Sequence, residues 1–182
     1  DVVDQSGVSA VTLYYKSSLT PYFSTTAMTL SGGLYTSTIA IGSNWISLNY
    51  YIVAIDTPGY SRTTNPYTTA VSDNDLPYIV SDNSDSSAFS EKVYTFKVAV
   101  SDNVKISTVY VSYWYDPATS GSLYTMTAMG GYYQYTITIP DSLSKLNYYF
   151  QVSDTTGNTI VGTTMIKPPT DGGGPVFGSV SS

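Results

Sequence analysis

The chain has 182 residues, a net charge of −6, and neither cysteine nor histidine. Without these two residue types there is no zinc site of the common kind, no Ser-His or Cys-His nucleophile pair and no disulfide framework. Seven basic residues against thirteen acidic ones argue against nucleic-acid binding, and apolar runs fall short of the roughly 18 to 20 residues that span a bilayer. The sequence begins at Asp1 without a leader peptide, so we expect a processed mature protein or a fragment.

The composition favours β-sheet. Nineteen tyrosines accompany abundant serine and threonine, and only 11% of the residues are charged. An ordinary soluble domain carries about 25% charged residues. Tyrosine and threonine fit a pleated sheet, and a surface with so little charge tolerates association with other copies of itself.

The sequence repeats itself after 98 residues. Leu48–Tyr51 and Leu146–Tyr149 both read LNYY, and Gly32–Tyr35 is followed 98 residues later by Gly130–Tyr133. From Asp4 to Gly59 the comparison needs no gap and matches at 20 of 56 positions. Chance gives about one match in ten at this composition, so the repeat is real.

Alternating apolar residues predict strands in chain order. The first copy gives the inward faces Val11-Leu13-Tyr15, Tyr35-Ser37-Ile39-Ile41 and Tyr50-Ile52-Ala54. The second copy adds a core strand at 93–100 and then gives Val109-Val111-Tyr113, Tyr133-Tyr135-Ile137-Ile139 and Tyr148-Phe150-Val152. This alternation is typical of half-buried strands, and a repeat of this size matches an immunoglobulin-like sandwich of about 100 residues. We predict an all-β chain of two tandem immunoglobulin-like β-sandwiches.

The run Leu48–Asp56 with Gly59, repeated as Leu146–Asp154 with Gly157, resembles the late strand of fibronectin type III and related immunoglobulin-like domains. Turns such as Asp102–Val104 are similar to those of modules in bacterial and archaeal surface proteins. The resemblance covers nearly the whole chain and implies a fold without implying chemistry, because such domains serve as spacers, adhesins and filament subunits.

The repeat also shows that the first copy lacks a segment. The chain is 14 residues shorter than two full repeats, and the first copy has no counterpart of Asp85–Val98, which contains a core strand of the second copy. We therefore expect the first domain to expose an apolar slot, which a neighbouring copy fills by strand donation. A flexible tether, Gly172–Gly174, precedes the expected donor residues Pro175, Val176, Phe177 and Val180. The alternative is that the ends are boundaries within a longer tandem array.

The outward residues of the first LNYY strand, Tyr51, Val53 and Ile55, form an apolar face, whereas the second strand has Tyr149, Gln151 and Ser153 in these positions. This difference predicts a second contact surface on the first domain, with coverage by a neighbouring loop or sheet as the alternative.

Acidic turns raise the question of calcium. The segment from Asp56 to Asp73-Asn74-Asp75 is similar to the calcium-binding junction of cadherin repeats, which implies Asp56, Asp73, Asn74 and Asp75 as ligands. The paired acids and glutamate ligands of that family have no counterparts here. Asx-rich turns also form without metal, because these side chains cap their own backbone. Calcium is the one cofactor that we consider.

Aromatic residues give the second functional hypothesis. If Tyr110 and Trp114 on one strand joined Tyr132 on another, they would form a platform for stacking sugar rings. Structural packing of Trp114 is the alternative. We find no motif that places two carboxylates across a cleft, so we expect no enzyme.

These observations combine into one expectation. We predict an immunoglobulin-like domain at 1–72, a linker at 73–76, a second such domain at 77–168 and a tail at 169–182. The expected function is structural, in an extracellular filament or cell-surface assembly of identical copies joined head to tail by strand donation, similar in logic to donor-strand pili and archaeal thread filaments. A carbohydrate-binding or adhesive module, or a fragment of a longer surface-layer protein, is the alternative.

Overall fold

The protein is described by a computed structural model that places residues 2–142 and 144–172. The chain divides into two compact units, Asp1–Asn74 and Asp75–Ser182. The described residues form strands and turns, and none of them belongs to a helix that could cross a membrane. The prediction of an all-β chain is confirmed.

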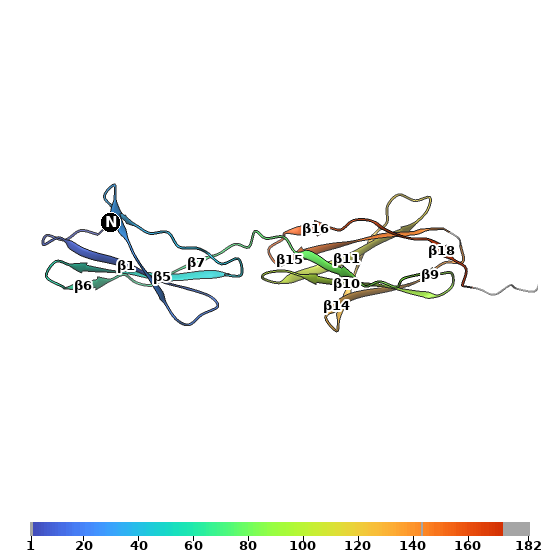
Figure 1. Cartoon of the computed structure of the whole chain (residues 1–182), viewed down its shortest axis with the longest axis horizontal. Helices are drawn as coiled ribbons and strands as arrows, with labels where there is room; N and C mark the ends of the chain where they lie inside the picture. The colour runs from blue at the N-terminus through green and yellow to red at the C-terminus, as the bar shows by residue number, and fades with distance from the viewer. Residues whose placement is uncertain (1, 143, 173–182) are drawn as a thin grey trace, which may run out of the picture. The chain divides into compact units, whose positions relative to one another are not determined.

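The first unit contains a sheet and a separate hairpin. Its strands are β1 (Val8–Ser17), β2 (Ser24–Ala27), β3 (Thr29–Ser31), β4 (Leu34–Thr36), β5 (Ser47–Asp56), β6 (Ser61–Thr63) and β7 (Tyr67–Ala70). The sheet has the order β2-β1-β5-β6, with β7 also paired to β5, and β3 pairs only with β4. Figure 1 labels β1, β5, β6 and β7 of this sheet.

The second unit contains two complete sheets. Its strands are β8 (Tyr78–Asp82), β9 (Ala88–Phe89), β10 (Val93–Ser101), β11 (Ile106–Tyr115), β12 (Leu123–Thr125), β13 (Thr127–Met129), β14 (Tyr132–Thr138), β15 (Leu146–Asp154), β16 (Thr159–Val161), β17 (Met165–Lys167) and β18 (Pro169–Thr170). One sheet has the order β13-β14-β10-β8, and the other has the order β12-β11-β15-β16 with β17 on β15. The short strands β9 and β18 pair in parallel.

The sequence repeat is also a repeat of strand register. Val11 pairs with Ala54 in the first unit, and Val109 pairs with Val152 in the second. Both pairings contain an irregularity near the start of the first strand, before Ala10 and before Thr108. The sheet built on β1 and β5 therefore corresponds to the sheet built on β11 and β15.

The core of the second unit lies between its two sheets. Tyr94, Phe96 and Val98 alternate along β10 and have no exposed surface, and they meet buried residues of β11 and β15 in one cluster. Alternation places these side chains on one face of the strand, and burying each large apolar side chain contributes about 1.5–3 kcal/mol. The second unit is thus the immunoglobulin-like sandwich that the sequence predicts.

The first unit has the same sheet but little of the opposing one. Among its described apolar residues, Val11 alone is buried, whereas the second unit buries twelve. The strand predicted over Tyr35–Ile41 ends at Thr36, while its counterpart β14 continues to Thr138. That part of the prediction is wrong, because β14 pairs with β10 along its length and residues 2–74 provide no such partner for β4.

Candidate assembly surface

The inner face of the first unit is only partly covered. A hollow of about 330 Å³ opens between its sheet and its hairpin. It is lined by Val2, Val11, Met28, Tyr35, Tyr50, Ile52, Thr64 and Tyr67. We call this surface the open face. Most of the lining is apolar or aromatic, which is the character of a core rather than of a solvated surface.

In the second unit, the surface that corresponds to the open face is buried. The counterparts of Met28, Tyr50 and Ile52 are Met126, Tyr148 and Phe150, and all three are buried. Strand β10 lies over them: the ring of Phe96 packs 5.1 Å from the ring of Tyr148. Within residues 2–74, only Val2 and Val3 correspond to β10, and nothing corresponds to β8. The open face is therefore the surface that two strands cover in the second unit.

A polar link also fastens β8 to the core of the second unit. The hydroxyl of Tyr148 donates a hydrogen bond of 2.6 Å to Oδ2 of Asp82, on β8. Burial, followed by this hydrogen bond, raises the pKa of Tyr148 far above its ordinary value, and burial raises the pKa of the adjacent Tyr94 to about 12. Both phenols therefore stay protonated to a higher pH than an ordinary tyrosine, whose pKa is 10.0.

The tail residues proposed from sequence as donors, Pro175, Val176, Phe177 and Val180, lie outside the described residues. The last described residue, Gly172, is fixed against the second unit: its amide donates to Oγ of Ser90 over 3.1 Å. A Cβ at this position would lie 2.5 Å from the carbonyl oxygen of Ser90, so the close approach requires glycine.

The outer face of the first unit carries an aromatic cluster. Tyr51 stacks on Tyr14 with ring centroids 4.8 Å apart, and Phe23 packs edge-on against Tyr51 at 5.0 Å. Val53 and Ile55 continue the same face of β5. Other rings of the first unit therefore cover part of Tyr51, which agrees with the alternative that a neighbouring loop or sheet covers this face. Ile55 remains 36% exposed.

The expected sugar-stacking platform is not assembled. Tyr110 and Trp114 lie on β11, and Trp114 packs edge-on against Tyr149 at 6.0 Å. Tyr132 lies on β14, in the other sheet, beneath the ammonium group of Lys97 at 4.2 Å. The core between the sheets contains Val111 of β11 and Phe96 of β10. Because side chains alternate along a strand, Trp114 and Lys97 point away from this core, each on its own sheet. Tyr132, which lies under Lys97, and Trp114 therefore face opposite sides of the sandwich. The predicted platform is wrong in this respect.

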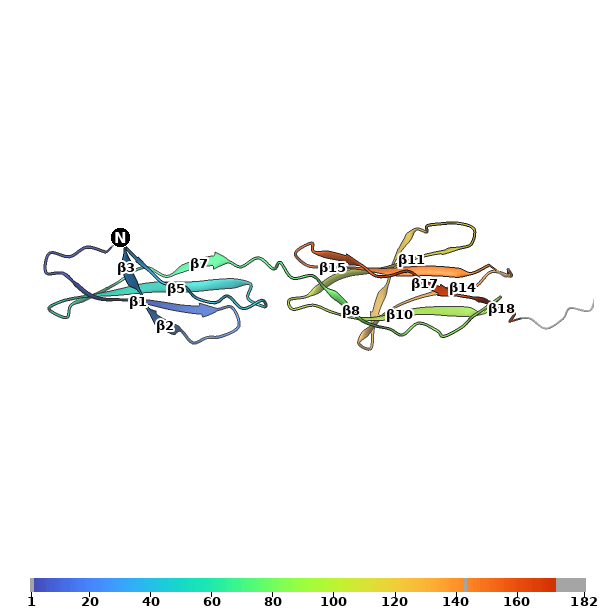
Figure 2. The ribbon, with the colours of Figure 1, turned by 45° about the horizontal axis from the view of Figure 1, so that its top comes forward.

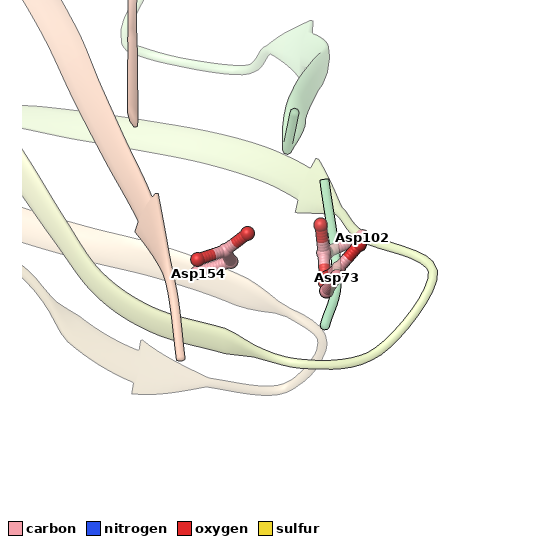
Figure 3. Close-up of side chains that lie close together, drawn as sticks. All are labelled: Asp73, Asp102 and Asp154. Carbon is pink, nitrogen blue, oxygen red and sulfur yellow. The ribbon is translucent and has the colours of Figure 1, made fainter. Parts of the chain in front are cut away.

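The acidic residues group differently from the expected calcium ligands. Figure 3 shows Asp154 at the end of β15, Asp102 after β10 and Asp73 in the connecting residues 71–77, and one carboxylate oxygen of each lies within 4.8 Å of the others. Of the expected set of Asp56, Asp73, Asn74 and Asp75, this group contains only Asp73. Asp154 is the counterpart of Asp56 after 98 residues, so the repeat carried a signal that pointed to it.

Two of these carboxylates already cap turns. Oδ1 of Asp154 accepts hydrogen bonds from three backbone amides, including those of Thr156 and Gly157. Oδ1 of Asp102 accepts from Val104 and Lys105. Burial acts to raise the pKa of Asp154, but the hydrogen bonds outweigh it and hold the pKa below its usual value. Among the described residues, the carboxylates of Asp73, Asp102 and Asp154 lie close enough together to hold a cation such as calcium. The turns already account for Oδ1 of Asp102 and of Asp154.

No family model matches the chain, and a search of the curated proteins finds no match. Among solved structures, the chain is similar to fibronectin(III)-like modules of Clostridium thermocellum CbhA, with 15% identity, coverage of 94% of this chain and 82% of that one, and a TM-score of 0.37. It is also similar to the D00-D0 domain of intimin, with 13% identity, coverage of 91% and 87%, and a TM-score of 0.32.

Proposed function

We propose that this protein is a structural subunit of an extracellular, cell-surface assembly, in which copies join head to tail by donating a β-strand. The observation that carries the proposal is the open face, whose counterpart in the second unit is a buried core under β8 and β10. The surface location comes from the sequence resemblance to modules of bacterial and archaeal surface proteins.

The occupant proposed for the open face is the tail of a second copy. Its sequence, Pro175-Val176-Phe177-Gly178-Ser179-Val180, is apolar and follows three glycines. The low charge of the chain favours self-association, because few like charges have to approach one another. A contact between a tail and a face is heterologous, so it does not close on itself and extends into a chain of copies. The proposal assigns no catalytic residue.

The test compares the full chain with a chain that ends at Gly174. Size-exclusion chromatography with light scattering gives the mass of each species. We expect the full chain to form species at multiples of the 19.6 kDa monomer and the truncated chain to remain monomeric. A full chain that stays at 19.6 kDa at all concentrations contradicts the proposal and favours a piece of a longer array.

A further inference from the structure

The first strand of the second unit, β8, has an irregular pairing with β10. Figure 2 shows β8 beside β10. Ile79 lies opposite Val100, Ser81 lies opposite Ala99, and Val80 has no partner in this pairing. Such a bulge inserts one extra residue and changes the phase of the alternation. As a result Ile79 and Asp82, three residues apart, both face the core: Ile79 packs against the cluster, and Asp82 reaches Tyr148.

The tail has the sequence spacing that this irregular strand requires. After 98 residues, Pro175 corresponds to Pro77, which is fully buried, and Phe177 corresponds to Ile79. Val180 corresponds to Asp82. In a regular strand, Phe177 and Val180 would face opposite sides, because side chains alternate. A bulge at Gly178, the counterpart of Val80, would turn both apolar side chains to the same side, and glycine suits a bulge.

The first unit has a hollow at the place that corresponds to Ile79 of the second unit. This second hollow, of about 320 Å³, is lined by Val2, Val3, Ile52, Ala54, Arg62, Thr63 and Thr64. Its counterpart in the second unit is filled by Ile79, which pairs with Val100 and comes so close to Gly162 that a Cβ there would lie 2.7 Å from Cδ1 of Ile79.

The hollow persists although Thr64 replaces Gly162. The hydroxyl of Thr64 accepts a hydrogen bond of 3.0 Å from the amide of Ile52, so this group is engaged with the sheet's own backbone. Val2 lines this hollow and also the hollow of the open face, and Val3 is 83% exposed. The backbone of these two residues corresponds to the part of β10 that pairs with β8.

We propose that the donated tail binds as the lead strand of the next copy's first unit, in the register that β8 has in the second unit. Phe177 then lies opposite Val2 and fills the hollow beside Ile52 and Thr64, and Val176 lies opposite Val3. Val180 covers Tyr50 as Asp82 covers Tyr148. This inference rests on the proposed strand donation and adds the register and the anchoring side chain.

Engineered disulfides test the register, because the chain has no cysteine of its own. Residues opposite each other in an antiparallel pair lie about 4.5–5.5 Å apart at Cα, within the range that a disulfide bridges. The variant Val3→Cys/Val176→Cys should therefore form covalent multimers on oxidation. The matched variant Val3→Cys/Ser179→Cys displaces the second cysteine by three residues, about 10 Å along a strand, and should form at most a tenth as many.

The outcomes separate the register from the proposed function. If the parent chain does not assemble, strand donation and the register both fail. If it assembles but the Ser179 variant cross-links as well as the Val176 variant, or neither cross-links, only the register is overturned. A second comparison needs no disulfide: Phe177→Asp should abolish assembly, whereas Ser179→Asp, the counterpart of outward Ser81, should leave it within twofold of the parent chain. Equal assembly by the two variants would also overturn the register.

Discussion

Tyr50 and Tyr148 occupy the same position in the two repeats but have different environments. Tyr148 is fully buried beneath Phe96 and donates a hydrogen bond to Asp82. Tyr50 stacks on Tyr67 with ring centroids 5.3 Å apart and borders the hollow of the open face. The same sequence motif is therefore part of the buried core in the second unit and only half-buried in the first.

This difference predicts that the two units unfold separately in the dispersed protein. Each unit has one tryptophan, Trp45 in the first and Trp114 in the second, so Trp45→Phe and Trp114→Phe leave one fluorescent reporter each. In chains that end at Gly174, we expect Trp45 to report unfolding at a lower urea concentration than Trp114, because the first unit buries less apolar surface. Coincident transitions would show that the open face does not weaken the first unit.

Phe96 should be a principal source of stability in the second unit. Its ring contacts Tyr94, Tyr113 and Tyr148 within 5.4 Å between centroids, and none of it is exposed. Replacing a buried phenylalanine by alanine costs about 3–5 kcal/mol, so Phe96→Ala should lower the unfolding free energy reported by Trp114 by that amount. The neighbouring Lys97→Ala removes a half-buried cation–π contact with Tyr132 and should cost about 0.5–1 kcal/mol. Similar costs for the two variants would argue against β10 as a core strand.

The hydrogen bond between Tyr148 and Asp82 predicts a second stability effect. Asp82→Ala leaves the hydroxyl of Tyr148 buried without this acceptor, and such a loss costs about 1–3 kcal/mol. Ser81→Ala on the same strand removes an exposed hydrogen bond to Asn83 and should change the free energy of unfolding by less than about 0.5 kcal/mol. Urea denaturation of the two variants checks this, and an Asp82→Ala variant as stable as Ser81→Ala would contradict the assignment.

Alkaline pH should destabilise the second unit. Burial raises the pKa of Tyr94 and of Tyr113 to about 12, against an ordinary value of 10.0. Because the folded state binds these protons more tightly than the unfolded state does, the two tyrosines do not change stability below about pH 10, and stability falls as the pH rises from 10 towards 12. Urea midpoints followed through Trp114 should decrease over this interval, and less steeply in Tyr94→Phe. A midpoint that stays constant to pH 12 would contradict this prediction.

Much of the fold could be predicted from sequence because the two copies inform each other. Alternation in Val109–Tyr113 and Tyr148–Val152 identified the buried faces of β11 and β15, and the repeat transferred them to β1 and β5. The continuation of a strand to Ile41 could not be predicted in this way. Whether β4 extends depends on a partner strand, which is a property of the tertiary structure and not of residues 35–41.

The candidate sites were harder to predict for a related reason. Alternation shows that Trp114 and Tyr132 point away from the core, but it does not show that their strands belong to different sheets. The group of acidic residues was difficult to predict for the same reason. Asp73, Asp102 and Asp154 are far apart in sequence and come together in the folded structure, whereas proximity in sequence pointed to Asn74 and Asp75. Only the 98-residue offset from Asp56 indicated Asp154 in advance.

Electron microscopy of the purified chain is the most direct test of strand donation. We expect filaments from the full chain and none from the chain that ends at Gly174. Adding the truncated chain to the full chain should shorten the filaments, because an open face without a tail binds one end and stops growth. Filaments that form equally well without residues 175–182, or a full chain that remains dispersed, would contradict strand donation.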